Sequence, residues 1–271
     1  MIPAKFDYEV AESVDAAVRL LGQADEAKLL AGGHSLLPLM KLRFARPALL
    51  VDIGRVPDLA YVRDAGSSLA IGALTRHHDV AGDPLLARHC PLVSMTAAKI
   101  GDPQVRHRGT IGGSVAHGDP ASDLPTVLLA LDAELEVHGP GGTRTIAAGD
   151  FFTGFLETAL GPQDVLTEIR VPKLGGAGSA YVKFRRRAQD WATVGVAAVR
   201  SKGGAKVGLT NMGPTPLRAR GVEEALAGGA SAAVAAERAA DGTSPPSDTA
   251  GTAEYRRALA RVLVGRALEE I

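Results

Sequence analysis

Two glycine pairs flanked by hydroxyl side chains constrain the fold of this chain more than any other feature. The first is AGGHS at residues 31–35, and the second is TIGGS at residues 110–114. Because glycine has no Cβ, it lets the backbone approach a ligand closely and adopt dihedral angles that other residues avoid. Either pair alone is typical of a tight turn. Together, each ahead of a predicted helix, they also fit two halves of one anion site built from free N–H groups.

The two best-known nucleotide motifs are missing from the sequence. Neither G-x-G-x-x-G nor G-x-x-x-x-G-K-[ST] occurs, although the chain contains 32 glycines. These motifs are the signatures of the ordinary dinucleotide-binding fold and of the P-loop. Two interpretations of the glycine pairs therefore stay open, a pair of ordinary turns and a two-loop clamp around a diphosphate.

Composition narrows the chemistry and the location. Lys plus Arg number 30 and Asp plus Glu number 30, so no charge excess favours nucleic acid or an anionic membrane as a partner. We see no transmembrane stretch and no signal peptide, and expect a cytoplasmic protein, with peripheral association at the inner face of the membrane left open. The single cysteine, Cys90, cannot hold an iron–sulfur cluster and is expected to be buried packing. Redox chemistry in this chain would need an organic cofactor.

Hydrophobic periodicity predicts alternating strands and helices at first, then strands, then helices. At a length of 271 residues the chain can form two or three compact subdomains. We expect one helix starting near Thr75 and another over residues 83–100, then a polar loop over 101–109 and a helix starting at Ser122. The strand-to-helix order of the last hundred or so residues independently favours an α+β domain. The predicted strands are 27–30, 48–54, 68–73, 133–139, 143–148, 165–172, 180–187, 192–200 and 205–211, and the other helices are 13–22, 35–43, 221–240 and 252–271.

Two long segments carry a family resemblance. KLLAGGHSLLPLMKLR and TIGGSVAHGDPASDLP resemble the two FAD-binding signatures of the flavoprotein (medium) subunit of molybdenum hydroxylases, of the carbon monoxide dehydrogenase type and the xanthine dehydrogenase FAD domain. The resemblance continues through VLTEIRVP, YVKFRRRAQDWATVGVAA and TNMGPTPLRA. It implies an α+β protein with the two-subdomain FAD-binding fold of the PCMH/vanillyl-alcohol-oxidase type, at residues 1–54 and 55–172. A C-terminal α+β domain with a small antiparallel sheet would follow at residues 173–271.

The resemblance also implies a set of FAD-contacting residues. Asp123 would bind FAD hydroxyl groups, although it also suits a helix N-cap. Ile100 and Leu166 would pack near the adenine or the isoalloxazine, or serve as core residues. Lys183 would lie near the flavin ring and stabilise its anionic reduced form, with an exposed strand lysine as the alternative. Trp191 stacks on the ring or packs in the core. The diphosphate would lie between Ala31, Gly32, Gly33, His34 and Ser35 on one side and Thr110, Ile111, Gly112, Gly113 and Ser114 on the other.

The function implied is that of an electron-transfer subunit. FAD in this chain would take electrons from the [2Fe–2S] clusters of a small subunit and pass them to a quinone, a cytochrome or NAD. A large subunit with the molybdenum cofactor would oxidise the substrate, in an assembly with two copies of each chain. The sequence contains no nucleophile–base pair and no metal-ligand cluster, so we expect no catalytic or metal residues. The alternatives are a self-contained flavoenzyme resembling the enolpyruvyl reductases, and a nucleotide-binding assembly protein.

Overall fold

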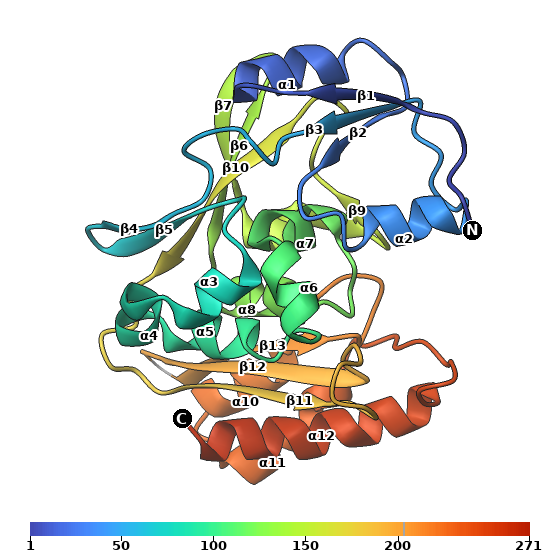
Figure 1. Cartoon of the computed structure of the whole chain (residues 1–271). Helices are drawn as coiled ribbons and strands as arrows, with labels where there is room; N and C mark the ends of the chain where they lie inside the picture. The colour runs from blue at the N-terminus through green and yellow to red at the C-terminus, as the bar shows by residue number, and fades with distance from the viewer. Residues whose placement is uncertain (203) are drawn as a thin grey trace.

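The computed structural model describes residues 1–202 and 204–271, which form sheets of three, five and four strands (Figure 1). The first sheet has the strand order β1-β3-β2, and both of its pairs are parallel. Parallel neighbours need crossover connections, which helices α1 and α2 supply. Helix α1 begins at Ser13, whose hydroxyl accepts the N–H of Ala16 at 3.1 Å. The elements are β1 (Asp7–Val10), α1 (Val14–Leu21), β2 (Ala27–Leu30), α2 (Leu36–Lys41) and β3 (Leu49–Asp52).

The second sheet is antiparallel throughout and has the order β4-β5-β10-β6-β7. Its strands are β4 (Val62–Ala65), β5 (Ser68–Gly72), β6 (Glu134–Gly139), β7 (Gly142–Ala147) and β10 (Val165–Pro172). A group of short helices packs between this sheet and the C-terminal part of the chain (Figure 1). They are α3 (His77–Gly82), α4 (Pro84–His89), α5 (Pro91–Ala97), α6 (Pro103–Arg108), α7 (Ile111–His117) and α8 (Asp123–Ala130). Helix α9 (Ala148–Phe151) and the hairpin β8 (Phe152–Gly154) and β9 (Glu157–Thr158) complete this region.

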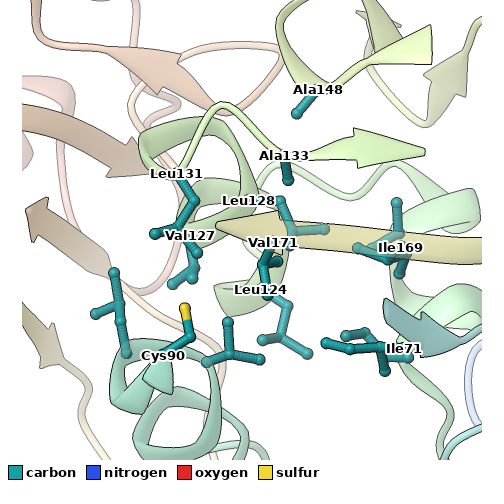
Figure 2. Close-up of a cluster of buried hydrophobic side chains, with 14 of the residues drawn as sticks. Ile71, Cys90, Leu124, Val127, Leu128, Leu131, Ala133, Ala148, Ile169 and Val171 are labelled. Atoms are coloured by element: carbon teal, nitrogen blue, oxygen red, sulfur yellow. The ribbon is translucent and has the colours of Figure 1, made fainter. Parts of the chain in front are cut away.

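Helix α8 is the centre of the largest hydrophobic core. All of its residues are buried. Its leucines and valine face strands β5 and β10, and the Cys90 side chain lies among them (Figure 2). Burial raises the pKa of the Cys90 thiol to about 12, so the thiol stays protonated and unreactive. The prediction that Cys90 is packing is confirmed. The residues labelled in the close-up are Ile71, Cys90, Leu124, Val127, Leu128, Leu131, Ala133, Ala148, Ile169 and Val171.

The third sheet separates two hydrophobic cores. Side chains alternate along a strand; on β11, Tyr181 joins the core around α8, whereas Ala180 joins a second core formed by the C-terminal helices. Helix α8 therefore covers one face of the sheet and the last helices cover the other (Figure 1). The strands are β11 (Ser179–Phe184), β12 (Val194–Ser201), β13 (Gly204–Thr210) and β14 (Leu217–Arg218). The helices are α10 (Arg220–Ala227), α11 (Ala232–Ala236), the 3₁₀ helix η1 (Glu237–Ala240) and α12 (Ala253–Glu269).

The α+β fold with a small C-terminal antiparallel sheet is confirmed, and three local predictions are wrong. The helix predicted over residues 83–100 is broken at Cys90, because Pro91 begins a new helix. The predicted loop over 101–109 contains helix α6. The helix predicted over 221–240 ends at Ala227, before the glycines at 228 and 229. The subdomain limits at residues 54 and 172 stay a prediction. The three sheets occur along the chain in the same order as the three predicted subdomains.

Candidate functional site

A large cavity of about 1320 Å³ lies where the first two sheets meet the end of β11. It exceeds the roughly 300–1,000 Å³ that is usual for a small-molecule site. The wall begins at the edge strand β2 and the loop after it, and it continues along α6 and α7 to Lys183 and Trp191. Of the predicted cofactor residues, all except Ile111 line this cavity.

The two glycine loops are in direct contact beside the cavity. A Cβ placed on Gly32 would lie 2.3 Å from the Arg108 carbonyl oxygen and 2.9 Å from the Cα of Gly109. Only glycine therefore allows the first loop to lie against the segment that leads into the second. A Cβ on Gly113 would lie 2.7 Å from the Thr110 hydroxyl oxygen and 4.0 Å from the methyl carbon of Ala31. The structure thus brings together the two segments that the sequence predicted as halves of one site.

The first loop presents unused hydrogen-bond donors. Within residues 1–202 and 204–271, the N–H groups of residues 32–36 have no acceptor. Gly33 has a φ of +75°, which turns this backbone in the left-handed region that favours glycine. The His34 imidazole donates through Nδ1 to the Gly32 carbonyl at 3.1 Å, and this fixes the loop while leaving Nε2 available. A run of free N–H groups at a helix start is a binding site for an anionic group.

The second loop works differently from the sequence prediction. The Ile111 N–H donates to the Thr75 carbonyl at 3.0 Å, and the Gly112 N–H donates to the Ala73 carbonyl at 2.9 Å. The Gly113 N–H donates to the Thr110 hydroxyl at 3.1 Å, which makes Thr110 the N-cap of α7. Because each of these donors already has a protein acceptor, this loop shapes the wall and the first loop supplies the free donors.

Two glycines and one isoleucine of the second loop have distinct positions. Ile111 does not line the cavity, because its side chain is completely buried in the core around α8. Gly112 lets α7 pack on the end of β5, since a Cβ there would lie 2.5 Å from the Cβ of Ala73. Gly113 is exposed toward the cavity. The three residues thus serve the core, the packing of α7 and the cavity wall, in that order.

Asp123 and Lys183 form one buried ion pair at the cavity wall. Lys183 Nζ lies 2.7 Å from Asp123 Oδ2, and the Tyr181 hydroxyl donates to Asp123 Oδ1 at 2.5 Å. The Asp123 and Lys183 side chains are 5% and 3% exposed. Burial raises the pKa of the Asp123 carboxyl, and the attraction of Lys183 opposes that rise. Lys183 is therefore no exposed strand lysine; the two predicted cofactor residues hold each other in place.

Basic side chains converge on the segment that carries Ile100. Lys183 and Arg185 each donate to the Lys99 carbonyl at 3.3 Å, and Arg106 donates to the Ile100 carbonyl at 2.8 Å. These contacts fix Ile100 as part of the cavity wall between α5 and α6. Of these basic side chains Lys183 itself lines the cavity, where its charge is paired with Asp123.

The two remaining predicted positions have clear outcomes. Leu166 of β10 is 6% exposed, belongs to the core around α8 and also lines the cavity, so both interpretations of this residue apply. Trp191 is 55% exposed at the cavity mouth, so the prediction that it packs in the core is wrong. Whether either side chain touches a cofactor stays a prediction.

Sequence reasoning missed several residues that shape the site. Tyr181 binds Asp123 from β11, and Gly109 and His77 line the wall beside the first loop. The signal for Tyr181 was its position two residues before Lys183, on the same side of a strand. The contacts of Gly109 and His77 join segments that are distant in sequence, so local patterns could not reveal them.

In the part of the chain that the structure describes, no group of three or more His, Cys, Asp and Glu side chains is arranged to hold a metal ion. Among the same residues, no helix is both long and apolar enough to cross a membrane.

Comparison with protein families identifies the class. Residues 4–174 match the family described as the FAD binding domain in molybdopterin dehydrogenase, and residues 179–271 match the carbon monoxide dehydrogenase flavoprotein C-terminal domain. The chain belongs to the FAD-binding family of molybdopterin dehydrogenases. It is an FAD-binding oxidoreductase subunit of the medium-chain type.

Curated relatives and solved structures share the whole chain. The carbon monoxide dehydrogenase medium chain of Hydrogenophaga pseudoflava is 46% identical, with 99% of this chain and 97% of the relative covered. The glyceraldehyde dehydrogenase medium chain of Sulfolobus acidocaldarius is 38% identical, with 100% of both chains covered. The structure of the Hydrogenophaga pseudoflava enzyme, in a form lacking the Mo-pyranopterin moiety, superposes with a TM-score of 0.96 over 100% of this chain and 98% of that chain.

The residues of this chain fit FAD. The free N–H groups of the first loop are suitable donors for a negatively charged diphosphate. The absence of a Cβ on Gly32 lets the two glycine loops lie against each other beside these donors. The cavity volume suits a ligand as long as a dinucleotide. The Lys183 ammonium group, at the same end of the wall as Ile100, suits a ring system that gains negative charge on reduction.

Proposed function

We propose that this chain is the electron-transfer subunit of a molybdenum hydroxylase complex, with its diphosphate site at the first glycine loop. The observation that carries the proposal is the run of unpaired N–H groups at residues 32–36, which lies on the wall of the large cavity. Bound FAD can exchange electrons singly or in pairs, which suits a carrier between iron–sulfur clusters and a mobile acceptor.

Each part of the chain has a separate task in this proposal. The first loop binds the diphosphate, and the contact of Gly32 with the Arg108 carbonyl fixes its distance from the second loop. Lys183, held by Asp123 and backed by the Lys99 carbonyl, keeps a positive charge at the end assigned to the flavin ring. Trp191 lies at the mouth on the same side. The cavity shields bound groups from water on the β10 side, where Leu166 closes the wall.

The names of the relatives, which are medium chains or subunits of complexes, support partner subunits for this chain. A small subunit with [2Fe–2S] clusters would deliver electrons, a large molybdenum subunit would oxidise the substrate, and an external quinone, cytochrome or NAD would receive the electrons. Relatives that share this fold are named after carbon monoxide, glyceraldehyde and 6-hydroxypseudooxynicotine dehydrogenases. This diversity supports a substrate site on the large subunit. We assign two copies of each chain to the assembly.

The test is purification of the tagged chain after co-expression with the proteins encoded beside it. Flavin and iron–sulfur absorption in one complex with two co-eluting chains is the expected result. A yellow protein that elutes alone and is bleached by NADPH would instead establish a self-contained reductase. A complex without flavin would leave only an assembly role.

Glycine variants locate the diphosphate site within that complex. Gly33→Val adds a side chain at φ +75° and 2.8 Å from Leu37, and Gly113→Val adds one at the cavity wall, 2.7 Å from the Thr110 hydroxyl. We expect both complexes to lose FAD. Gly66→Val is the matched control, because Gly66 has a φ of +81° but nothing within 4 Å of its Cβ position and does not line the cavity. That variant should lose about 1–2 kcal/mol of stability and keep its flavin. Full flavin content in both loop variants would contradict the assignment.

A further inference from the structure

His77 is a buried histidine at the cavity wall. It is the first residue of α3, is 4% exposed and lines the cavity. Its backbone N–H donates to the Gly109 carbonyl at 3.0 Å. Its Nδ1, by contrast, is buried and has no hydrogen-bond partner in the described part of the chain. A buried polar atom without a partner is rare in a folded protein and calls for a physical reason.

The surroundings determine which ring nitrogen carries the proton. Burial, together with the nearby Arg106 and His34, lowers the pKa of His77 to about 4, so the ring is neutral at pH 7. A neutral imidazole has one donor and one acceptor nitrogen. Among buried backbone groups, an N–H without a partner is rarer than an under-satisfied oxygen, and the same preference is applied to the two ring nitrogens. The proton therefore lies on Nε2, and the buried Nδ1 keeps its lone pair.

Gly109 leaves the Nε2 edge of this ring uncovered. Its φ of −60° and ψ of 141° are open to any residue, so the backbone conformation does not require glycine there. A Cβ at Gly109 would lie 2.8 Å from Cδ2 of His77 and 3.2 Å from Nε2. A side chain at this position would collide with the ring and cover Nε2, and glycine avoids both. Gly109 also lines the cavity.

The open edge lies beside the free donors of the first loop. A Cβ on Gly32 would come within 2.9 Å of the Cα of Gly109, so the first loop, Gly109 and His77 are successive layers of one wall. A neutral N–H donor at this place needs an oxygen acceptor from a ligand. Of the parts of FAD, the diphosphate is the one that the adjacent N–H groups of residues 32–36 attract.

We propose that His77 is a positioning residue that donates an Nε2–H hydrogen bond to the FAD diphosphate, on a wall kept open by Gly109. This inference rests on the proposed function and adds a side-chain donor from a third segment to the two glycine loops. The neutral ring orients the diphosphate without adding a positive charge to a site that Arg106 already makes electropositive.

The experiment compares FAD affinity of co-expressed complexes that differ at this histidine. His77→Leu removes the donor and should weaken FAD binding about tenfold to a hundredfold, the effect of one hydrogen bond to a charged group. His77→Gln keeps an N–H donor and should bind FAD within a few-fold of wild type. Gly109→Ala covers the Nε2 edge and should behave like His77→Leu. The matched control is Asp79→Leu on α3, at an exposed position that does not line the cavity, which should leave FAD affinity unchanged.

Two further readouts separate a diphosphate contact from a structural role. At saturating FAD, the ³¹P resonances of the bound diphosphate should shift in the His77→Leu complex while the visible flavin spectrum stays the same. Wild-type affinity in His77→Leu, unshifted ³¹P resonances, or an equal loss in His77→Leu and His77→Gln with lower melting temperatures would each overturn the inference. A wild-type complex without FAD would instead overturn the proposed function itself.

Discussion

At the scale of single residues, the ion pair between Asp123 and Lys183 is the most consequential contact of the site. Both side chains are almost fully buried, and Tyr181 donates a second hydrogen bond to the carboxylate. Removing one partner of a buried pair leaves an uncompensated charge, whereas removing both is far less costly. The cavity wall is therefore stable when both partners of the pair are present, and it is destabilised most when only one of them is removed.

The variant Lys183→Met tests this dependence. It should lower the free energy of unfolding by about 3–5 kcal/mol at pH 8. Burial raises the pKa of Asp123 above its unfolded value, so the folded state takes up a proton more readily; the loss should be smaller at pH 5 and grow as pH rises through the folded pKa. The double variant Asp123→Asn/Lys183→Met should recover most of the loss. Urea denaturation at both pH values checks this, and a pH-independent loss would contradict it.

At the scale of elements, α6 connects the cofactor wall to the rest of the fold. It follows the Ile100 segment, and its end at Gly109 contacts the first loop. Asp102 caps α6 by accepting the Val105 N–H at 2.9 Å, with Pro103 in the first turn. Asp83 caps α4 in the same way through the Leu86 N–H at 2.9 Å, with Pro84 next to it, but α4 lies outside the cavity.

These two caps make a matched pair of variants. Asp102→Ala and Asp83→Ala should each lower the free energy of unfolding by about 0.5–2 kcal/mol, because each leaves helix N–H groups without an acceptor. Only Asp102→Ala should also reduce the flavin content of the complex, since it loosens the segment between Ile100 and Gly109. Thermal melts and flavin extraction measure the two effects. Equal flavin content in both variants would show that α6 does not position the wall.

Helix α6 also shows what sequence reasoning could and could not predict. Residues 101–109 have a polar composition, which favoured a loop, yet Asp102 followed by Pro103 is a helix-start pattern that could have revealed the helix. The glycine loops were predictable because glycine and hydroxyl residues make a local pattern. The pairing of Asp123 with Lys183, and the approach of His77 to Gly109, depend on how distant segments pack. No local pattern contains that information.

At the scale of the whole molecule, the C-terminal part is joined to the rest by a shared core. Tyr181, Ala197 and Val199 belong to the same hydrophobic cluster as Leu69 and Leu124. The connection between the two parts runs through Gly175 and Gly176, which are exposed and have φ values of +59° and +85°. The covalent link is thus at the surface while the packing contact is internal.

A cut in this link should therefore leave the two parts together. We expect a protease site inserted between Gly175 and Gly176 to be cleaved readily, and the two fragments to co-elute in size-exclusion chromatography. Tyr181→Ala should weaken this association, because it removes a fully buried aromatic side chain from the shared core, a loss of about 3–5 kcal/mol. Fragments that separate without that substitution would show that the shared core is too weak to hold them.

The ion pair between α8 and β11 can also couple the affinity for flavin to the affinity for a partner subunit. Asp123 and Lys183 belong to the cavity wall and also to the seam between the two packed parts of the chain. A ligand that orders the wall through these two residues also orders the seam. A protein that binds at the seam and orders it likewise orders the wall for the ligand. Thermodynamic reciprocity makes the two factors equal. A partner subunit that binds the C-terminal part and orders the seam should thus raise the affinity for flavin. Bound flavin should raise the affinity for that subunit by the same factor.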